Sequence, residues 1–281
     1  MNYKIKHLVT TLAALLLLGG CVSTKTLFGD AEQEVQTNEQ EQAPITQETA
    51  GAQGIEVEPI SPEEQRALDT AALVNASENR FQASKKANAP RTRALLLEAL
   101  SAYQNEEYEV ALTLMQSAKQ LADPMNSSAY VLDGDIYVAL DDVDRAAKSY
   151  DNALSLNPDN FKAANRRALL HREQGEFEQA LTLYSQAIES YSAHAPSYRN
   201  RGVLYDLYLG NKALALKDYQ MYADLLTYQQ SQTAQDAVML TSLSEAQLKR
   251  EARRVKGWLI DVERQVQAQV DNVARQADGT E

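Results

Sequence analysis

The chain has little of what cross-linked, metal-binding and catalytic proteins use most. Its 281 residues include one Cys, three His and one Trp. A single Cys can form neither an internal disulfide nor a cysteine-rich zinc site. Positive charge is also scarce, because 27 Lys and Arg stand against 39 Asp and Glu and leave a formal net charge of −12. So acidic a surface repels phosphate backbones, and nucleic-acid binding is not expected.

Glycine and most aromatic residues are infrequent as well. With 11 Gly and few aromatics apart from 14 Tyr, the composition favours an all-α chain over a sheet protein. The sequence contains no zinc-protease motif, no serine-hydrolase nucleophile motif and no Gly-rich phosphate loop. His171 is interpreted as a packing residue rather than a catalytic one. We therefore expect no enzyme activity, no cofactor and no metal site.

The N-terminus has the layout of a secretory signal. Lys4 and Lys6 precede the apolar run Leu8–Leu18, which is shorter than the roughly 20 residues that a transmembrane helix needs. The run ends in Leu18-Gly19-Gly20-Cys21, which resembles the lipobox of bacterial lipoproteins. The resemblance implies a signal peptide at residues 1–20 and lipidation (diacylglyceryl and palmitate chains) at Cys21. An ordinary signal peptide that happens to contain a Cys is the alternative.

The lipobox resemblance also bears on location. Two or three acyl chains are sufficient for durable membrane anchoring, whereas one is marginal. Val22 follows the Cys at the position where Asp would indicate retention in the inner membrane. By resemblance to the family, we expect a lipid anchor in the outer membrane, with the protein facing the periplasm.

A tether and a lead-in segment follow the anchor. Between Asp30 and Glu58 there are eight acidic residues and no Lys or Arg, without apolar periodicity, so residues 21–60 are predicted to be a disordered acidic tether. Residues 61–91 are predicted to be a lead-in. Its helix begins at the N-cap Ser61 and runs to about Ser84, before Pro90.

Residues 92–229 repeat with a period of about 34 residues. The segment Ser127–Asn160 shows the pattern best, with small and aromatic residues at Tyr130, Gly134, Tyr137, Ala146, Tyr150, Ala153 and Pro158. This pattern resembles the tetratricopeptide repeat. It recurs one period later, and it recurs in two further copies with one residue deleted after Tyr103 and one inserted near Gly210. The resemblance implies four repeats in a right-handed superhelical solenoid of helix hairpins. An Ala-rich helical bundle is the alternative.

Three repeats depart from the family pattern at the same place. Asp133, Arg167 and Arg201 stand where the family usually has Leu. Charged side chains there either weaken packing within the hairpin or mark a shift in which helix face is buried.

Residues 230–281 are predicted to contain a loop, a capping helix and a frayed tail. Ser244 begins a helix, and an apolar stripe follows with spacings of three and four residues, from Leu248 to Val266. The last hairpin of a solenoid must be covered, so this helix is expected to cap the array.

The resemblance implies that the first helices of successive repeats line a peptide-binding groove. Projecting the groove-facing positions onto this chain selects Asp135, Lys162, Asn165, Arg166, Arg172, Arg199 and Asn200. Lys162 and Arg166 share a helix face and would suit a carboxylate. They resemble half of the carboxylate clamp of chaperone-binding tetratricopeptide domains, but Leu97, Ser101 and Leu132 stand where the other half needs Lys and Asn. Ordinary solvated charge is the alternative.

The expected function is that of an outer-membrane-anchored periplasmic scaffold lipoprotein that binds protein or peptide partners in a cell-envelope assembly. Two alternatives stay open: an accessory subunit of an energised, TonB-type envelope transport system, and a regulator of a peptidoglycan hydrolase. The first of these alternatives follows a distant resemblance carried by residues 201–209 and 255–258.

Overall fold

The computed structural model describes residues 60–121, 123–232, 244–277 and 279, in which every regular element is a helix. The chain divides into two units, Met1–Glu56 and Val57–Glu281, and all described residues belong to the second. None of the described helices is both long and apolar enough to cross a membrane. The signal peptide, Cys21, nearly all of the acidic tether and most of the loop after residue 230 lie outside the described residues.

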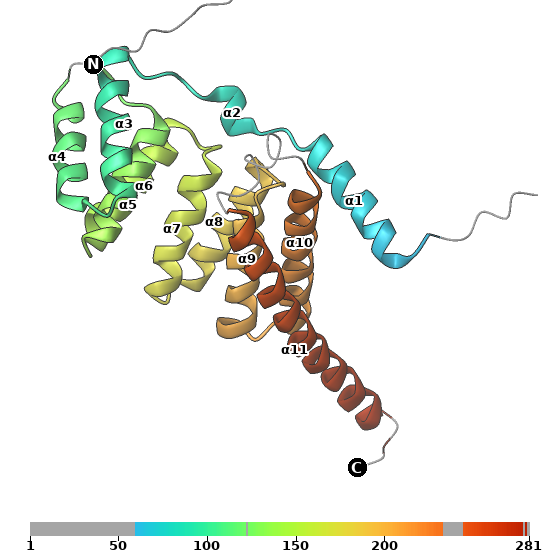
Figure 1. The fold of residues 1–281 in the computed structure, drawn as a ribbon. Helices are drawn as coiled ribbons and strands as arrows, with labels where there is room; N and C mark the ends of the chain where they lie inside the picture. The colour runs from blue at the N-terminus through green and yellow to red at the C-terminus, as the bar shows by residue number, and fades with distance from the viewer. Residues whose placement is uncertain (1–59, 122, 233–243, 278, 280–281) are drawn as a thin grey trace, which may run out of the picture. The chain divides into compact units, whose positions relative to one another are not determined.

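Helix hairpins follow one another along the described chain (Figure 1). They are α3 (Pro90–Gln104) with α4 (Tyr108–Lys119), α5 (Ser127–Ala139) with α6 (Val143–Leu156), α7 (Phe161–Glu173) with α8 (Phe177–Ser190), and α9 (Ala195–Val203) with α10 (Lys212–Ser231). The second helix of each hairpin packs against the first helix of the next. The prediction of an all-α array of helix hairpins is confirmed.

The turn inside each hairpin contains one residue in the left-handed region: Glu106, Asp141, Gly175 and Gly210, with φ values from 59° to 80°. Such a residue closes the first helix of the hairpin. In the α5–α6 turn, for example, the N–H of Asp142 donates to the C=O of Tyr137 at 2.8 Å. The four turn residues are 35, 34 and 35 positions apart, which is nearly constant spacing.

The last turn is one residue late because α9 continues into a π-helical turn, η1 (Leu204–Tyr208). Here the N–H of Leu209 donates to the C=O of Leu204 at 3.0 Å. A π-turn takes up one extra residue within a helix. The insertion that the sequence indicates near Gly210 therefore lies in η1.

Small residues stand where the helices cross closely. Ala153 and Ala187 are fully buried. Gly134 on α5 lies against the ring of Tyr150 on α6, and a methyl group built at Gly134 would come within 2.4 Å of that ring. Gly202 on α9 faces Tyr219 on α10 in the same way. These contacts let the two helices of a hairpin approach each other closely.

The C-terminal helix α11 (Glu245–Ala277) packs on α10. It buries Leu248, Val255 and Val262 against the last hairpin. The ring of Trp258 lies 5.5 Å from that of Tyr219, measured between centroids. The helix therefore covers the last hairpin, and it extends to Ala277.

The lead-in consists of two helices where the sequence indicates one. They are α1 (Pro62–Ala76) and α2 (Arg80–Ser84). The Ser77 hydroxyl donates to the C=O of Leu73 at 2.7 Å near the end of α1, and the Asn79 side chain accepts from the N–H of Gln82 and begins α2. Short polar side chains that bond the backbone in this way favour helix ends over helix interiors.

Candidate interaction surface

The seven predicted groove residues all lie on first helices of hairpins. Asp135 is on α5, Lys162, Asn165, Arg166 and Arg172 are on α7, and Arg199 and Asn200 are on α9. The structure brings most of them together in pairs that join one first helix to the next. The positions were chosen for ligand contact, and the pairs described below also hold neighbouring repeats together.

The α5–α7 pair is Asp135 with Arg166, whose Nε lies 2.5 Å from the carboxylate. Asp135 also accepts a hydrogen bond from the Tyr150 hydroxyl at 2.7 Å. Desolvation raises the pKa of the Asp135 carboxyl above its ordinary value, although the Arg166 charge and the Tyr150 hydrogen bond oppose this. The Arg166 side chain remains 47% exposed, so its guanidinium is still accessible to a ligand.

The α7–α9 pair consists of amides. The Asn200 side chain donates to Asn165 Oδ1 at 3.1 Å. Arg199 directly precedes Asn200 on α9 and approaches Glu251 of α11, with 3.9 Å between Nη1 and the carboxylate. Glu251 also accepts from the Tyr222 hydroxyl and from Arg254. A row of polar contacts thus joins α5, α7, α9 and α11, in that order.

Lys162 differs from the other cations of the row. It is exposed and has no ion pair among the described residues, and its Nζ lies 5.9 Å from the centroid of the Phe161 ring. Partial desolvation lowers the pKa of its ammonium group, and the nearby Lys85 and Arg166 cations lower it further. The Asp135 carboxylate acts in the opposite direction, but it is paired with Arg166, so an anion placed beside Lys162 would meet a cation that has no ion pair of its own among the described residues.

Arg172 lies apart from this row. Its guanidinium lies 5.9 Å from the centroid of the Tyr208 ring of η1. The neighbouring His171 contacts Glu176 in the turn to α8. Arg172 therefore belongs to the α7–η1 contact rather than to the Asp135–Arg166 pair.

The residues around this row of polar contacts limit which reactions or ligands the surface can support. Burial lowers the pKa of His194 to about 3, so this imidazole stays neutral and does not serve as an acid–base group near neutral pH. Among the described residues, no group of His, Cys, Asp and Glu is placed to hold a metal ion. What the surface offers is hydrogen bonding and charge, which suit the binding of a polar chain.

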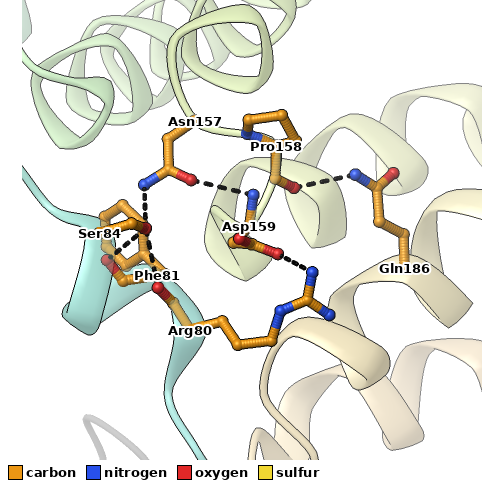
Figure 2. A network of polar contacts seen from close by, with 7 residues as sticks. All are labelled: Arg80, Phe81, Ser84, Asn157, Pro158, Asp159 and Gln186. Atoms are coloured by element: carbon orange, nitrogen blue, oxygen red, sulfur yellow. Dashed lines mark hydrogen bonds and ion pairs between the residues drawn. The ribbon is translucent and has the colours of Figure 1, made fainter.

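Sequence reasoning missed a second polar surface, where α2 meets the loops between hairpins (Figure 2). Arg80 pairs with Asp159 at 2.5 Å, and the Asn157 side chain donates to the Ser84 hydroxyl at 3.0 Å. Phe81 is buried there, edge-on to Phe161 with 5.9 Å between ring centroids. The sequence signal was the segment 80–93, which has five basic residues and no acid.

Comparison with known families identifies the repeats. Two overlapping segments, residues 132–195 and 166–237, match the family model described as tetratricopeptide repeat. The two segments together span residues 132–237, which is less than half of the chain. A search of curated proteins finds no significant match.

Several solved structures are similar to this chain. YrrB, described as a TPR protein with an unusual peptide-binding site, is 22% identical over 48% of this chain and 68% of its own, with a TM-score of 0.41. TTC0263, a thermophilic TPR protein from Thermus thermophilus, is 17% identical over 58% and 98% of the two chains, with a TM-score of 0.43. MamA is 16% identical over 59% and 95%, with a TM-score of 0.44.

Proposed function

We propose that this protein is a scaffold that binds protein partners along the first helices of its tetratricopeptide repeats. The observation that carries this proposal is Lys162, an exposed cation on α7 with no carboxylate partner among the described residues. It lies one helical turn from the half-exposed Arg166. In a chain with a net charge of −12, such a local excess of positive charge favours an acidic group on the partner.

The polar row supports this role by fixing the geometry of the surface. The Asp135–Arg166 and Asn165–Asn200 contacts hold α5, α7 and α9 in register before any partner arrives. A preformed surface loses less side-chain conformational entropy on binding, so less of the binding free energy is offset. Lys162 would then hold a carboxylate of the partner by a charge-assisted hydrogen bond.

Crosslinked capture tests this proposal. Wild type and Lys162→Ala are expressed in the native host, crosslinked in intact membranes and recovered under denaturing conditions. We expect Lys162→Ala to recover at least one specific partner several-fold less well, with unchanged helicity and melting, because exposed charges add little to stability. The matched control is Lys148→Ala, which removes an exposed Lys from the second helix α6. Equal recovery by Lys162→Ala and wild type would refute binding through this surface.

The anchor is part of the same proposal and is supported by the sequence alone. Leu18-Gly19-Gly20-Cys21 after a short apolar run favours lipidation of Cys21, and Val22 favours the outer membrane with the repeats in the periplasm. Such a tethered protein would serve a cell-envelope assembly. Cys21→Ser should abolish incorporation of labelled palmitate and leave the precursor uncleaved. A variant that is still acylated would refute the anchor without affecting the scaffold proposal.

A further inference from the structure

The lead-in crosses the loops that join one hairpin to the next. At its start, the Ser77 hydroxyl lies 2.5 Å from the Ser192 hydroxyl in the α8–α9 loop. Further along, Ser84 accepts from Asn157 in the α6–α7 loop. At its end, the backbone C=O of Lys86 accepts from the Asn126 side chain in the α4–α5 loop at 2.7 Å. This segment, Ser77–Asn88, is called the strap below.

A cavity of about 220 Å³ lies between the strap and the loops on either side of the α5–α6 hairpin. The strap forms one wall with Phe81 and residues 84–87, and the loops form the other with residues 124–127 and 156–157. Two hydrogen bonds join these walls, from the Asn157 side chain to Ser84 and from the Asn126 side chain to the C=O of Lys86. The cavity therefore depends on the strap being docked.

The walls of this cavity are apolar and its lining carries positive charge. Phe81 and Met125 are buried side chains of the wall, and Leu156 is a large apolar side chain that is 55% exposed there. Lys85 and Lys86 also line the cavity, and neither has an ion pair among the described residues. Of the acids on this edge, Asp159 is already paired with Arg80, and Asp123 is exposed beside the lining residue Pro124.

The size of the cavity limits what it can hold. Pockets for whole cofactors or drug-sized ligands are about 300–1,000 Å³, so this cavity is too small for them. It has room for one large aliphatic side chain. A carboxylate next to that side chain would lie beside Lys85 and Lys86, which can bind it by charge-assisted hydrogen bonds.

We propose that the strap cavity binds the C-terminal residue of a partner peptide, with its aliphatic side chain between Phe81, Met125 and Leu156 and its carboxylate on Lys85 and Lys86. The proposal rests on the proposed function in taking the ligand to be a peptide. It places the site on the edge formed by the strap and the loops, apart from the Asp135–Arg166 row. Apolar walls give the affinity, and the two ammonium groups select a free chain end.

Fluorescence anisotropy with defined probes tests this proposal. The probe is a fluorescein-labelled Gly-Ser-Gly-Ser-Gly-Leu peptide with a free C-terminal carboxylate, titrated with the full chain in detergent. Two matched probes end in leucine amide or in alanine. We expect the free-acid leucine probe to bind at least about tenfold more tightly than either, since each lacks one of the two recognised groups. Equal affinity for the acid and the amide overturns the proposal.

Variants of the chain locate the site. Lys85→Ala with Lys86→Ala should weaken the free-acid probe about tenfold and leave the amide probe unchanged. Ala87→Trp, at an exposed position of the lining, should fill the cavity and abolish the preference for leucine over alanine. The control removes two exposed Lys elsewhere, Lys148→Ala with Lys256→Ala, and should bind every probe as wild type does.

The outcomes separate the two proposals. If the Lys85 and Lys86 variant binds the free-acid probe as tightly as the control variant does, the cavity is not the site and this inference fails. Partner capture that still depends on Lys162 would leave the scaffold proposal intact in that case. Loss of probe binding in the Lys85 and Lys86 variant, with partner capture independent of Lys162, would instead refute the groove and keep the cavity.

Discussion

The close contact between Gly134 and Tyr150 offers the sharpest test of the hairpin packing. Gly134→Ala adds a single methyl group to α5. Built on the existing backbone, that methyl would lie 2.4, 2.7 and 2.8 Å from three carbon atoms of the Tyr150 ring. Carbon atoms prefer separations of about 3.5–4.0 Å, so the ring or the helix must move by about 1 Å.

The ring has little freedom to move. Tyr150 is 1% exposed, and its hydroxyl donates to Asp135 at 2.7 Å. Overpacking of a well-packed site costs about 1–3 kcal/mol, and a lost hydrogen bond costs about 1 kcal/mol more. Replacing Gly by Ala inside a helix stabilises the folded state by about 1 kcal/mol through helix propensity. The last two contributions cancel, so the net expectation for Gly134→Ala is a loss of about 1–3 kcal/mol in the free energy of unfolding.

A matched variant isolates the steric effect from helix propensity. Gly257 lies inside α11, is exposed, and has no heavy atom within 4 Å of a methyl group built on it. Gly257→Ala should therefore stabilise the chain by about 0.5–1 kcal/mol. Urea unfolding followed by far-UV circular dichroism compares the midpoints of wild type and both variants. A midpoint for Gly134→Ala at or above that of wild type would refute the packing described here. Rescue of Gly134→Ala by Tyr150→Leu would support it.

Three further variants probe other parts of the fold. Ala187→Leu should lower the free energy of unfolding by about 1–3 kcal/mol, since Ala187 is fully buried; unchanged melting would place the repeat register elsewhere. Phe81→Ala should remove about 3 kcal/mol of strap docking and speed proteolysis within the strap while the hairpins stay helical; equal cleavage of variant and wild type would contradict this. Arg166→Ala should destabilise the chain by about 1–2 kcal/mol at pH 7 and less as the pH falls towards 4. The reason is that desolvation already raises the pKa of Asp135, and protonated Asp135 needs no cation; a pH-independent difference would contradict it.

Repeat architecture could be predicted because it depends on local spacing. Gly134, Ala153 and Ala187 mark helix crossings in the sequence itself, and Gly134 and Gly202, two periods apart, each face a Tyr ring of their own hairpin. The one-residue shift near Gly210 was also visible in the alignment of repeats. Its form, the π-turn η1, depends on the backbone path and was not.

The three departures from the family pattern show where sequence reasoning stops. Asp133 pairs with Lys119 of the preceding hairpin and accepts from Ser149. Arg167 pairs with Asp151 on α6, which also precedes it. Arg201 instead pairs with Asp218 within its own hairpin, through two hydrogen bonds of 2.8 Å. Two of these charges thus pair with the preceding hairpin and one pairs within its own, and only the structure shows the partner of each charge.

The strap could not be predicted for a related reason. Its contacts join residues far apart in the chain, such as Ser77 with Ser192 and Asn88 with Asn126, and none of them recurs at the repeat period. Short polar side chains of this kind are common at helix ends and in turns, so the sequence indicated a break rather than a docking surface. The basic run from Arg80 to Arg93 was the visible signal, but its meaning depends on the loops that face it.

The polar row changes how the groove must be tested. Arg166 was selected from the sequence as a ligand contact together with Lys162, but the structure pairs it with Asp135, which is only 12% exposed. Removing Arg166 leaves a largely buried carboxylate without its cation, so a loss of partner binding could follow from a shift of α5 against α7. Lys162 has no such partner among the described residues, so its removal breaks no ion pair and leaves no buried carboxylate without a cation. A fall in partner binding for Lys162→Ala at unchanged stability is therefore direct evidence for a ligand on this surface. The same fall for Arg166→Ala is evidence only after the pH-dependent loss of stability of that variant has been measured and taken into account.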